Sequence, residues 1–251
     1  PPPSGGRPCR RCAEAPLRIR APARYSPGLM GFTIKICGVR DAETARVAVE
    51  AGADRLGLVF FEKSPRHLAF EGAGAVVADI RRFAPDVRVV GLMVDPPDDE
   101  AQAAVGAGVD ELQLHGRETP DRLGEIRRLT ERPVWKALGV SSPADAARAG
   151  DYASVAAGVF FDAKPAAADD RPGGLGRRFD LAALEGYDGA APWVLSGGLD
   201  PDNVAGAVAA ARAISGFAGV DVSSGVESAP GVKDHARIRE FVRAARAAMG
   251  A

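Results

Sequence analysis

Two side chains that can move protons stand at the ends of short apolar segments. Cys37 closes the run Ile34-Lys35-Ile36-Cys37, and Asp162 directly follows Gly158-Val159-Phe160-Phe161. An apolar setting disfavours a charged carboxylate, so it would raise the pKa of Asp162 and suit that group to act as a general acid. The segment around Cys37 taken alone favours a buried core thiol over a nucleophile or base, because free cysteines are usually buried.

Glycine- and serine-containing segments follow two later apolar runs, as Ser196-Gly197-Gly198 and Ser223-Ser224-Gly225. Such segments expose backbone N–H groups and add hydroxyl donors, which suits a phosphate dianion, although each alone is also typical of a tight turn. Arg66, in Ser64-Pro65-Arg66, can pair bidentately with a carboxylate. An isolated arginine at such a place is more often a solvated surface residue.

Short apolar segments alternate with helical segments after residue 30. The expected strands are 34–37, 55–60, 88–94, 111–114, 134–137, 158–161, 193–195 and 219–222. The expected helices include 41–51, 70–83, one that closes at Gly106 or Gly108, one after Thr119-Pro120, a short one near Ser142-Pro143, one from about Pro201, and 233–249.

Eight strand–helix units in about 220 residues match a (β/α)8 TIM barrel, and strands rich in Val, Ile and Leu favour a parallel sheet. A doubly wound open sheet is the main competitor. It would normally carry G-x-G-x-x-G after its first strand, where this chain has Cys37-Gly38-Val39-Arg40. We therefore expect an α/β fold, a single barrel over residues 30–251 with a disordered N-terminal tail.

A barrel gathers the C-terminal ends of its strands around one mouth, where active sites lie. The two glycine- and serine-containing segments then follow strands seven and eight, a frequent place for phosphate binding, so phosphate is favoured over simple turns. Cys37 and Asp162 become an acid–base pair across the mouth. Cys37 would have to act as a thiolate, because a free thiol is mostly protonated at neutral pH. Other polar residues expected at the mouth are Asp95, Gln113, His115 and Lys136.

Residues 1–29 differ in composition from the rest of the chain, because they contain seven prolines, six arginines and a single acidic residue, Glu14. This composition cannot bury a core, so we expect disorder. Met30 directly precedes the first strand, and we hypothesise that the native protein starts there. Cys9 and Cys12 form a lone C-x-x-C without nearby partners, so no metal site is predicted.

Composition sets the remaining bounds. The net charge of −1 gives no argument for nucleic acid or a membrane surface. No window approaches the ~18 apolar residues that a membrane helix needs. Three cysteines in 251 residues do not make a disulfide framework, which favours a cytoplasmic protein.

The motifs taken together resemble the phosphoribosylanthranilate isomerase family from residue 34 to the last helix. The order and spacing of the matching segments are specific, although each segment alone is weak. They are Lys35-Ile36-Cys37-Gly38, Gly52-Ala53-Asp54, Ser64-Pro65-Arg66, Gln113-Leu114-His115-Gly116, Phe161-Asp162, Ser196-Gly197-Gly198-Leu199, Gly219 through Glu227, and Pro230-Gly231 with Lys233-Asp234.

The resemblance implies an Amadori rearrangement of N-(5-phosphoribosyl)anthranilate in tryptophan biosynthesis, without a metal or organic cofactor. It implies Asp162 as the general acid at the ribose ring oxygen and Cys37 as the general base at C2. It further implies that Arg66 holds the anthranilate carboxylate. Gly197, Gly198, Asp221, Ser223 and Ser224 match the phosphate side of the site. The expected partner is thus a small phosphorylated substrate, and the protein is expected to be a monomer or homodimer.

Two departures from the family pattern follow strand six. Leu175 stands between Gly174 and Gly176 where the family usually has Thr, and the segment 163–171 is long and rich in Ala and Asp. Since neither touches Asp162, we expect altered kinetics before lost activity.

Two alternatives stay open. A related dual-substrate sugar-phosphate isomerase barrel would rely on aspartates at strands one and six, and Cys37 argues against it. A catalytically idle barrel that serves as a binding subunit is disfavoured by the presence of both Cys37 and Asp162.

Overall fold

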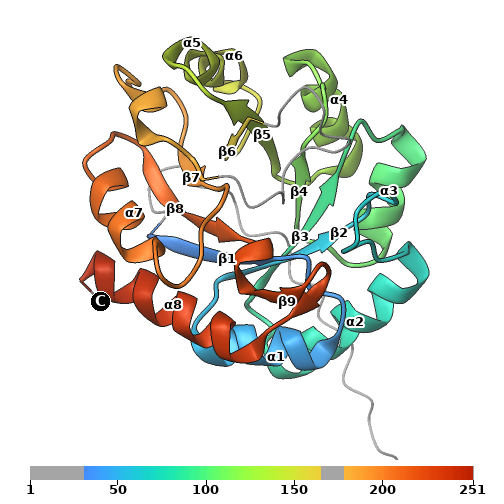
Figure 1. Cartoon of the computed structure of the whole chain (residues 1–251). Coiled ribbons are helices and arrows are strands. Elements are labelled where there is room, and N and C mark those ends of the chain that lie inside the picture. Colours follow the sequence, from blue (N-terminus) through green and yellow to red (C-terminus); the bar gives the residue numbers. More distant parts are fainter. Residues whose placement is uncertain (1–30, 165–177, 251) are drawn as a thin grey trace, which may run out of the picture.

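The protein is described by a computed structural model over residues 31–164 and 178–250. Its eight parallel strands close into a barrel in sequence order, because β8 pairs with β1. The strands are β1 (Thr33–Cys37), β2 (Arg55–Val59), β3 (Arg88–Met93), β4 (Glu111–Leu114), β5 (Val134–Val140), β6 (Gly158–Ala163), β7 (Trp193–Leu195) and β8 (Phe217–Val222). Figure 1 shows them enclosed by helices. The expected TIM barrel is confirmed, whereas the predictions for residues 1–29 and for Leu175 lie outside the described residues.

The helices follow most of the expected segments. They are α1 (Ala42–Ala51), α2 (Phe70–Phe83), α3 (Asp98–Gly106), α4 (Pro120–Thr130), α5 (Pro143–Ala147), α6 (Ala149–Tyr152), α7 (Val204–Ala211) and α8 (His235–Met249). Capping explains several starts: the side chain of Asp41 accepts a hydrogen bond from the Thr44 N–H, and Thr119 caps α4 with Pro120 in its first turn.

The connection from β6 to β7 departs from the expected eight strand–helix units. Its described residues contain only the 3-10 helix η1 (Leu181–Leu184). Gly186 and Gly189 follow with φ of 76° and 79°, which a continuing right-handed helix cannot adopt. A second difference is the start of α7, which begins at Val204 and not near Pro201. The preceding residues form a turn instead, in which the Asp200 side chain accepts hydrogen bonds from the N–H groups of Asp202 and Asn203.

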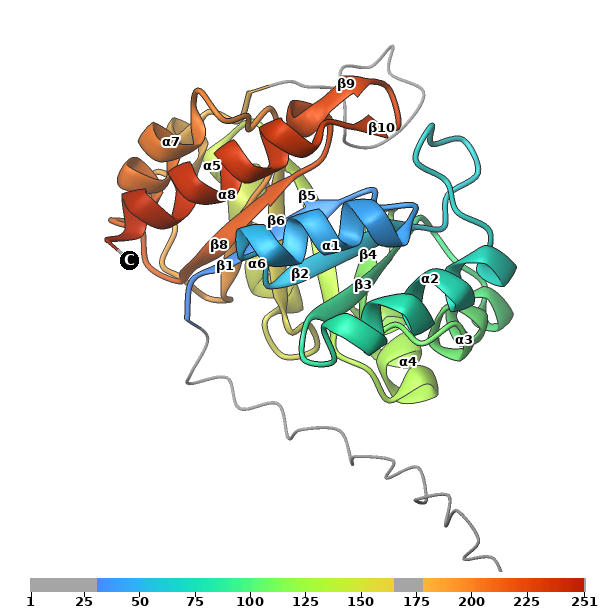
Figure 2. The ribbon, with the colours of Figure 1, turned by 90° about the horizontal axis from the view of Figure 1, so that it is seen from below.

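A two-stranded hairpin, not expected from the sequence, follows the 3-10 helix η2 (Ser224–Val226). It consists of β9 (Glu227–Ala229) and β10 (Val232–Lys233), paired antiparallel. Lys233 therefore belongs to a strand, and α8 starts two residues later, capped by the Asp234 side chain. Figure 2 shows the hairpin projecting beyond the β8 end of the barrel, next to the start of α8.

The barrel interior is filled from its N-terminal end. Arg55 on β2 pairs with Glu111 on β4 at 3.1 Å, and Trp135 Nε1 donates to the same carboxylate at 2.8 Å. Because β3 separates β2 from β4, this ion pair crosses the inside of the barrel. An apolar cluster continues the filling with Trp135, Ala137, Ala157, Phe160 and Val194. The polar residues near the C-terminal strand ends therefore stand above a packed core, not above a pore.

Candidate active site

Cys37 and Asp162 both lie at the C-terminal end of the barrel, as expected. Cys37 is the last residue of β1, and its side chain is 4% exposed. Asp162 lies inside β6, which extends two residues past the predicted end, and it is 7% exposed. Each residue is part of a barrel strand, β1 for Cys37 and β6 for Asp162, so neither side chain depends on a loop for its position.

The Asp162 carboxyl has the surroundings of a proton donor. Burial is the main cause that raises its pKa to about 7, and the nearby Asp221 carboxylate adds to the rise. The Ala163 N–H donates to Asp162 Oδ1 at 2.8 Å and opposes part of that rise. A substantial fraction of Asp162 therefore carries a proton at neutral pH, in agreement with the expected desolvation.

His115 approaches this carboxyl, with its Nε2 3.6 Å from Asp162 Oδ2. Burial lowers the His115 pKa to about 3, helped by the charges of Lys136 and Lys35. The ring is thus neutral at neutral pH and does not form an ion pair with Asp162. The sequence indicated His115 as a mouth residue but gave it no role.

The Cys37 thiol is mostly protonated at neutral pH, because its pKa is raised above the ordinary value. Burial raises its pKa, and this outweighs the opposing effects of the Lys35 and Lys233 ammonium groups. The thiolate that base catalysis requires is therefore a minority form, as expected for a free thiol, and burial makes it rarer still. The positive charges of Lys35 and Lys233 stabilise the thiolate when it forms.

Asp221 lies within β8, not in the loop beyond it. Its Oδ1 accepts from Lys35 Nζ at 3.0 Å, and Ser196 Oγ donates to its Oδ2 at 3.4 Å. A carboxylate also repels a phosphate dianion. Asp221 is thus a buried counter-ion of Lys35, whereas the resemblance assigned it to the phosphate side. Its charge raises the pKa of both Asp162 and Cys37.

The segments after β7 and β8 pack against each other. Gly197 and Gly198 take consecutive φ values of 89° and 63°, and a Cβ on Gly225 would collide with the carbonyl oxygen of Leu199. Ser224 begins η2, whereas Ser223 Oγ donates to the Cys37 carbonyl oxygen at 3.1 Å. The Ser223 hydroxyl therefore donates within the protein, and Ser223 would donate to a phosphate through its backbone N–H.

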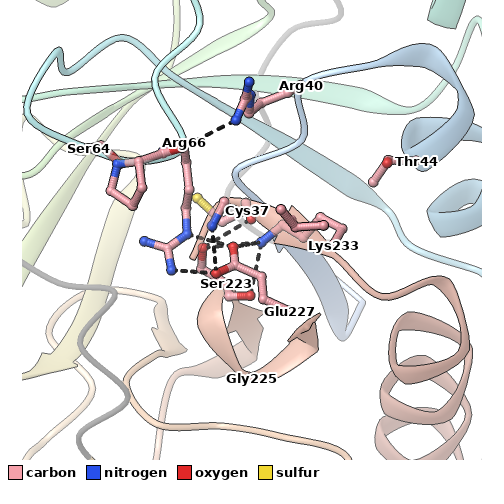
Figure 3. A network of polar contacts seen from close by, with 12 residues as sticks. Cys37, Arg40, Thr44, Ser64, Arg66, Ser223, Gly225, Glu227 and Lys233 are labelled. Atoms are coloured by element: carbon pink, nitrogen blue, oxygen red, sulfur yellow. Dashed lines mark hydrogen bonds and ion pairs between the residues drawn. The ribbon is translucent and has the colours of Figure 1, made fainter. Parts of the chain in front are cut away.

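Arg66 is 5% exposed, not a solvated surface residue. Its Nε and Nη2 donate to the two carboxylate oxygens of Glu227 at 2.7 and 2.8 Å. Figure 3 shows this pair beside Lys233, Ser223 and Cys37. In the sequence, Glu227 and Lys233 stand out only as members of the family motif. Nothing local indicates that they lie beside a residue more than 160 positions earlier.

Neither a metal-binding group of side chains nor a membrane-spanning helix is present in the described part of the chain. In residues 31–164 and 178–250, no three His, Cys, Asp or Glu side chains are grouped so as to hold a metal ion. No helix there is both long and apolar enough to cross a membrane. The Cys9–Cys12 pair lies outside these ranges.

Comparisons with known proteins agree on one family. A family model described as N-(5'-phosphoribosyl)anthranilate (PRA) isomerase matches residues 34–244. The chain is 50% identical over 223 residues to the N-(5'-phosphoribosyl)anthranilate isomerase of Azorhizobium caulinodans, which covers 88% of this chain and 95% of that protein.

Two crystal structures of such isomerases match across the barrel, each at 33% identity over 86% of this chain and 99% of the other. One holds reduced 1-(o-carboxyphenylamino)-1-deoxyribulose 5-phosphate and gives a TM-score of 0.73. The other, of mutually generated monomers of the dimeric protein from Thermotoga maritima, gives 0.72.

Proposed function

The chain belongs to the N-(5'-phosphoribosyl)anthranilate isomerase family of tryptophan biosynthesis, and from this we propose that Asp162 and Cys37 carry out its isomerisation as general acid and general base. The observation that carries the proposal is a buried carboxyl with a pKa of about 7 at the same barrel end as a buried thiol. The reaction converts N-(5'-phosphoribosyl)anthranilate into 1-(2-carboxyphenylamino)-1-deoxyribulose 5-phosphate.

The first step is ring opening. Asp162 gives its proton to the ribose ring oxygen while the bond from that oxygen to C1 breaks, and the anilino nitrogen lone pair forms the C=N bond of a protonated Schiff base. Burial supports this role, because it keeps the carboxyl protonated near neutral pH. A correctly placed acid contributes about 10²–10⁴-fold to such a step.

The second step moves the hydrogen at C2. The Cys37 thiolate takes the C2 proton, the C–H electron pair forms a C1=C2 double bond, and the C=N electrons return to nitrogen. The enol then becomes the ketone as its C2 hydroxyl loses a proton to solvent and C1 gains a proton from solvent. Lys35 and Lys233 support the thiolate electrostatically.

Substrate binding is assigned to the two sides of the mouth. Gly197, Gly198, Ser223 and Ser224 stand where backbone N–H groups and a hydroxyl can hold the phosphate, and Arg66 holds the anthranilate carboxylate. Asp221 joins the site through Lys35 and not as a phosphate ligand. We also propose a cytoplasmic protein, monomer or homodimer. The Thermotoga maritima relative is described as dimeric.

The activity is tested by mixing the purified chain with N-(5'-phosphoribosyl)anthranilate and following the loss of anthranilate-type fluorescence. Turnover supports the proposal. No turnover by protein that circular dichroism shows to be folded would favour the idle-barrel alternative. Comparable turnover of the histidine-pathway aminoimidazole ribotide would instead favour the dual-substrate alternative, which Cys37 in β1 opposes.

The order of the two pKa values predicts an unusual pH profile. Activity is proportional to the protonated fraction of Asp162 multiplied by the thiolate fraction of Cys37. Asp162 has a pKa of about 7, whereas the Cys37 pKa is raised above its ordinary value. We therefore expect kcat/KM to rise with pH up to about 7, stay level while the two fractions compensate, and fall only above the thiol pKa.

Measuring kcat/KM across this range checks the prediction. A rate that falls steadily from pH 7 upward would show that Cys37 is already ionised there, contrary to its burial. Titration of the substrate phosphate near pH 6 is common to wild type and variants, so comparing their profiles removes it.

Replacing Arg66 with Ala should raise KM for the substrate about 10- to 100-fold with a smaller change in kcat. The change removes a charge-assisted contact to the carboxylate, and such hydrogen bonds contribute about 1.5–3 kcal/mol. Steady-state kinetics on protein with the wild-type circular dichroism spectrum measures this. An unchanged KM would remove Arg66 as the carboxylate ligand.

A further inference from the structure

Glu227 lies between two buried cations at the rim of the site. Its oxygens accept from Arg66 Nε at 2.7 Å and Nη2 at 2.8 Å, and from Lys233 Nζ at 2.7 Å. The Gly231 N–H adds a fourth hydrogen bond at 3.2 Å. The Glu227 and Lys233 side chains are each 3% exposed and that of Arg66 is 6% exposed, so solvent screens the cluster little.

The hairpin that carries Glu227 is seated against the loop that carries Arg66. A Cβ on Gly231 would collide with the carbonyl oxygen of Pro65, and Arg40 Nη1 donates to that same oxygen at 3.3 Å. Arg66 is thus fixed at both ends, by its backbone through this contact and by its guanidinium through Glu227. In Figure 3 the guanidinium points toward Glu227 and the hairpin.

The same carboxylate reaches the base through Lys233. Lys233 Nζ donates to the Ser223 carbonyl oxygen at 2.9 Å and lies 3.4 Å from Ser223 Oγ, which donates to the Cys37 carbonyl oxygen at 3.1 Å. A chain of direct contacts therefore runs from the loop after β2 to the end of β1.

We propose that Glu227 is a positioning residue for the isomerase reaction, which holds the Arg66 guanidinium in the plane required by the substrate carboxylate and anchors Lys233 near the base. It uses two of the five guanidinium N–H donors and fixes the orientation of the whole planar group. The inference rests on the proposed function, since it needs Arg66 to bind substrate.

Steady-state kinetics of Glu227→Gln tests the inference. The amide keeps the shape but offers one oxygen acceptor in place of two, so Arg66 loses its bidentate partner. We expect KM to rise about tenfold or more and kcat to change less than about threefold, because Lys233 keeps its hydrogen bond to the Ser223 carbonyl oxygen. Because Glu227 acts through Arg66, the double variant Arg66→Ala/Glu227→Gln should have the KM of Arg66→Ala within about twofold. An unchanged KM in Glu227→Gln, or additive effects in the double variant, would overturn the proposal.

Two further variants separate positioning from stability. Asp110→Asn removes the partner of Arg81 at the opposite end of the barrel, and it should lower the unfolding temperature without raising KM. Glu227→Asp keeps the charge on a side chain shorter by one methylene, and it should give a KM between wild type and Glu227→Gln. If Glu227→Gln fails to fold, Glu227→Asp decides, and a wild-type KM there would overturn the proposal.

The proposed function and this inference fail separately. Absence of turnover by the folded wild-type chain overturns the isomerase assignment. Normal wild-type turnover with a Glu227→Gln variant of unchanged KM overturns the role of Glu227 alone.

Discussion

Asp162→Asn is expected to lower kcat/KM about 10³-fold while the barrel stays folded. Asparagine has nearly the same shape but no acidic proton, so the ring oxygen must leave without protonation. Its carbonyl oxygen can still accept the Ala163 N–H that bonds Asp162 Oδ1. The fluorescence assay measures the loss, and Asp162→Glu, which restores an acid, should recover part of it. Near-wild-type turnover in Asp162→Asn would remove Asp162 as the general acid.

The residual activity of Asp162→Asn should also show a changed pH profile. With the acid gone, the rate depends only on the thiolate fraction of Cys37, whose pKa burial raises. The bend near pH 7 should therefore disappear, and activity should keep rising with pH up to the pKa of the Cys37 thiol. This result would assign the bend near pH 7 to Asp162 and not to the substrate.

The same substitution should stabilise the protein above neutral pH. The folded-state pKa of Asp162 is raised from the ordinary 3.8 to about 7, so the folded protein binds this proton more tightly than the unfolded chain does. The contribution to stability is full below the unfolded pKa and is lost as pH rises through 7, which amounts to about 4 kcal/mol at most. The advantage of Asp162→Asn in thermal unfolding temperature should grow between about pH 5.5 and pH 8. A constant difference would contradict the raised pKa.

The raised pKa of Asp162 illustrates what a sequence can indicate. Four apolar or small residues precede it, and in a parallel sheet such a run predicts a desolvated strand end. The strand positions and the Asp41 and Thr119 caps were predictable for the same reason, because they depend on neighbours a few residues away. The short 3-10 helix before β7 was not predicted from the sequence.

Contacts between distant segments were not predictable from residue types. Arg66 was expected to hold the substrate carboxylate, and nothing in the sequence indicated that Glu227, 161 positions away, holds its guanidinium. Asp221 was grouped with the phosphate side, yet its carboxylate pairs with Lys35, 186 positions away. Both pairs join side chains that meet only once the barrel has closed.

The Lys35–Asp221 pair links the acid to the base. The Asp221 carboxylate raises the pKa of both Asp162 and Cys37, and the Lys35 ammonium lowers both. Because Asp221 raises both pKa values and Lys35 lowers both, the pair does not push the pKa values of Asp162 and Cys37 apart. It follows that the reactive combination of protonated Asp162 and ionised Cys37 is a minor state, which accounts for the level region in the expected pH profile.

Cys37→Ser is expected to lower kcat/KM about 10³-fold or more, because an alcohol is far harder to ionise than a thiol and serves poorly as a base. Its residual rate should depend only on protonated Asp162 and so fall as pH rises through about 7, the reverse of Asp162→Asn. Cys37→Asp is the matched control: a carboxylate in the same strand position restores an ionisable base and should be more active than Cys37→Ser. A Cys37→Ser enzyme that keeps the rising limb and most of its activity would show that another group takes the C2 proton, and that Cys37 is the buried core thiol its segment first indicated.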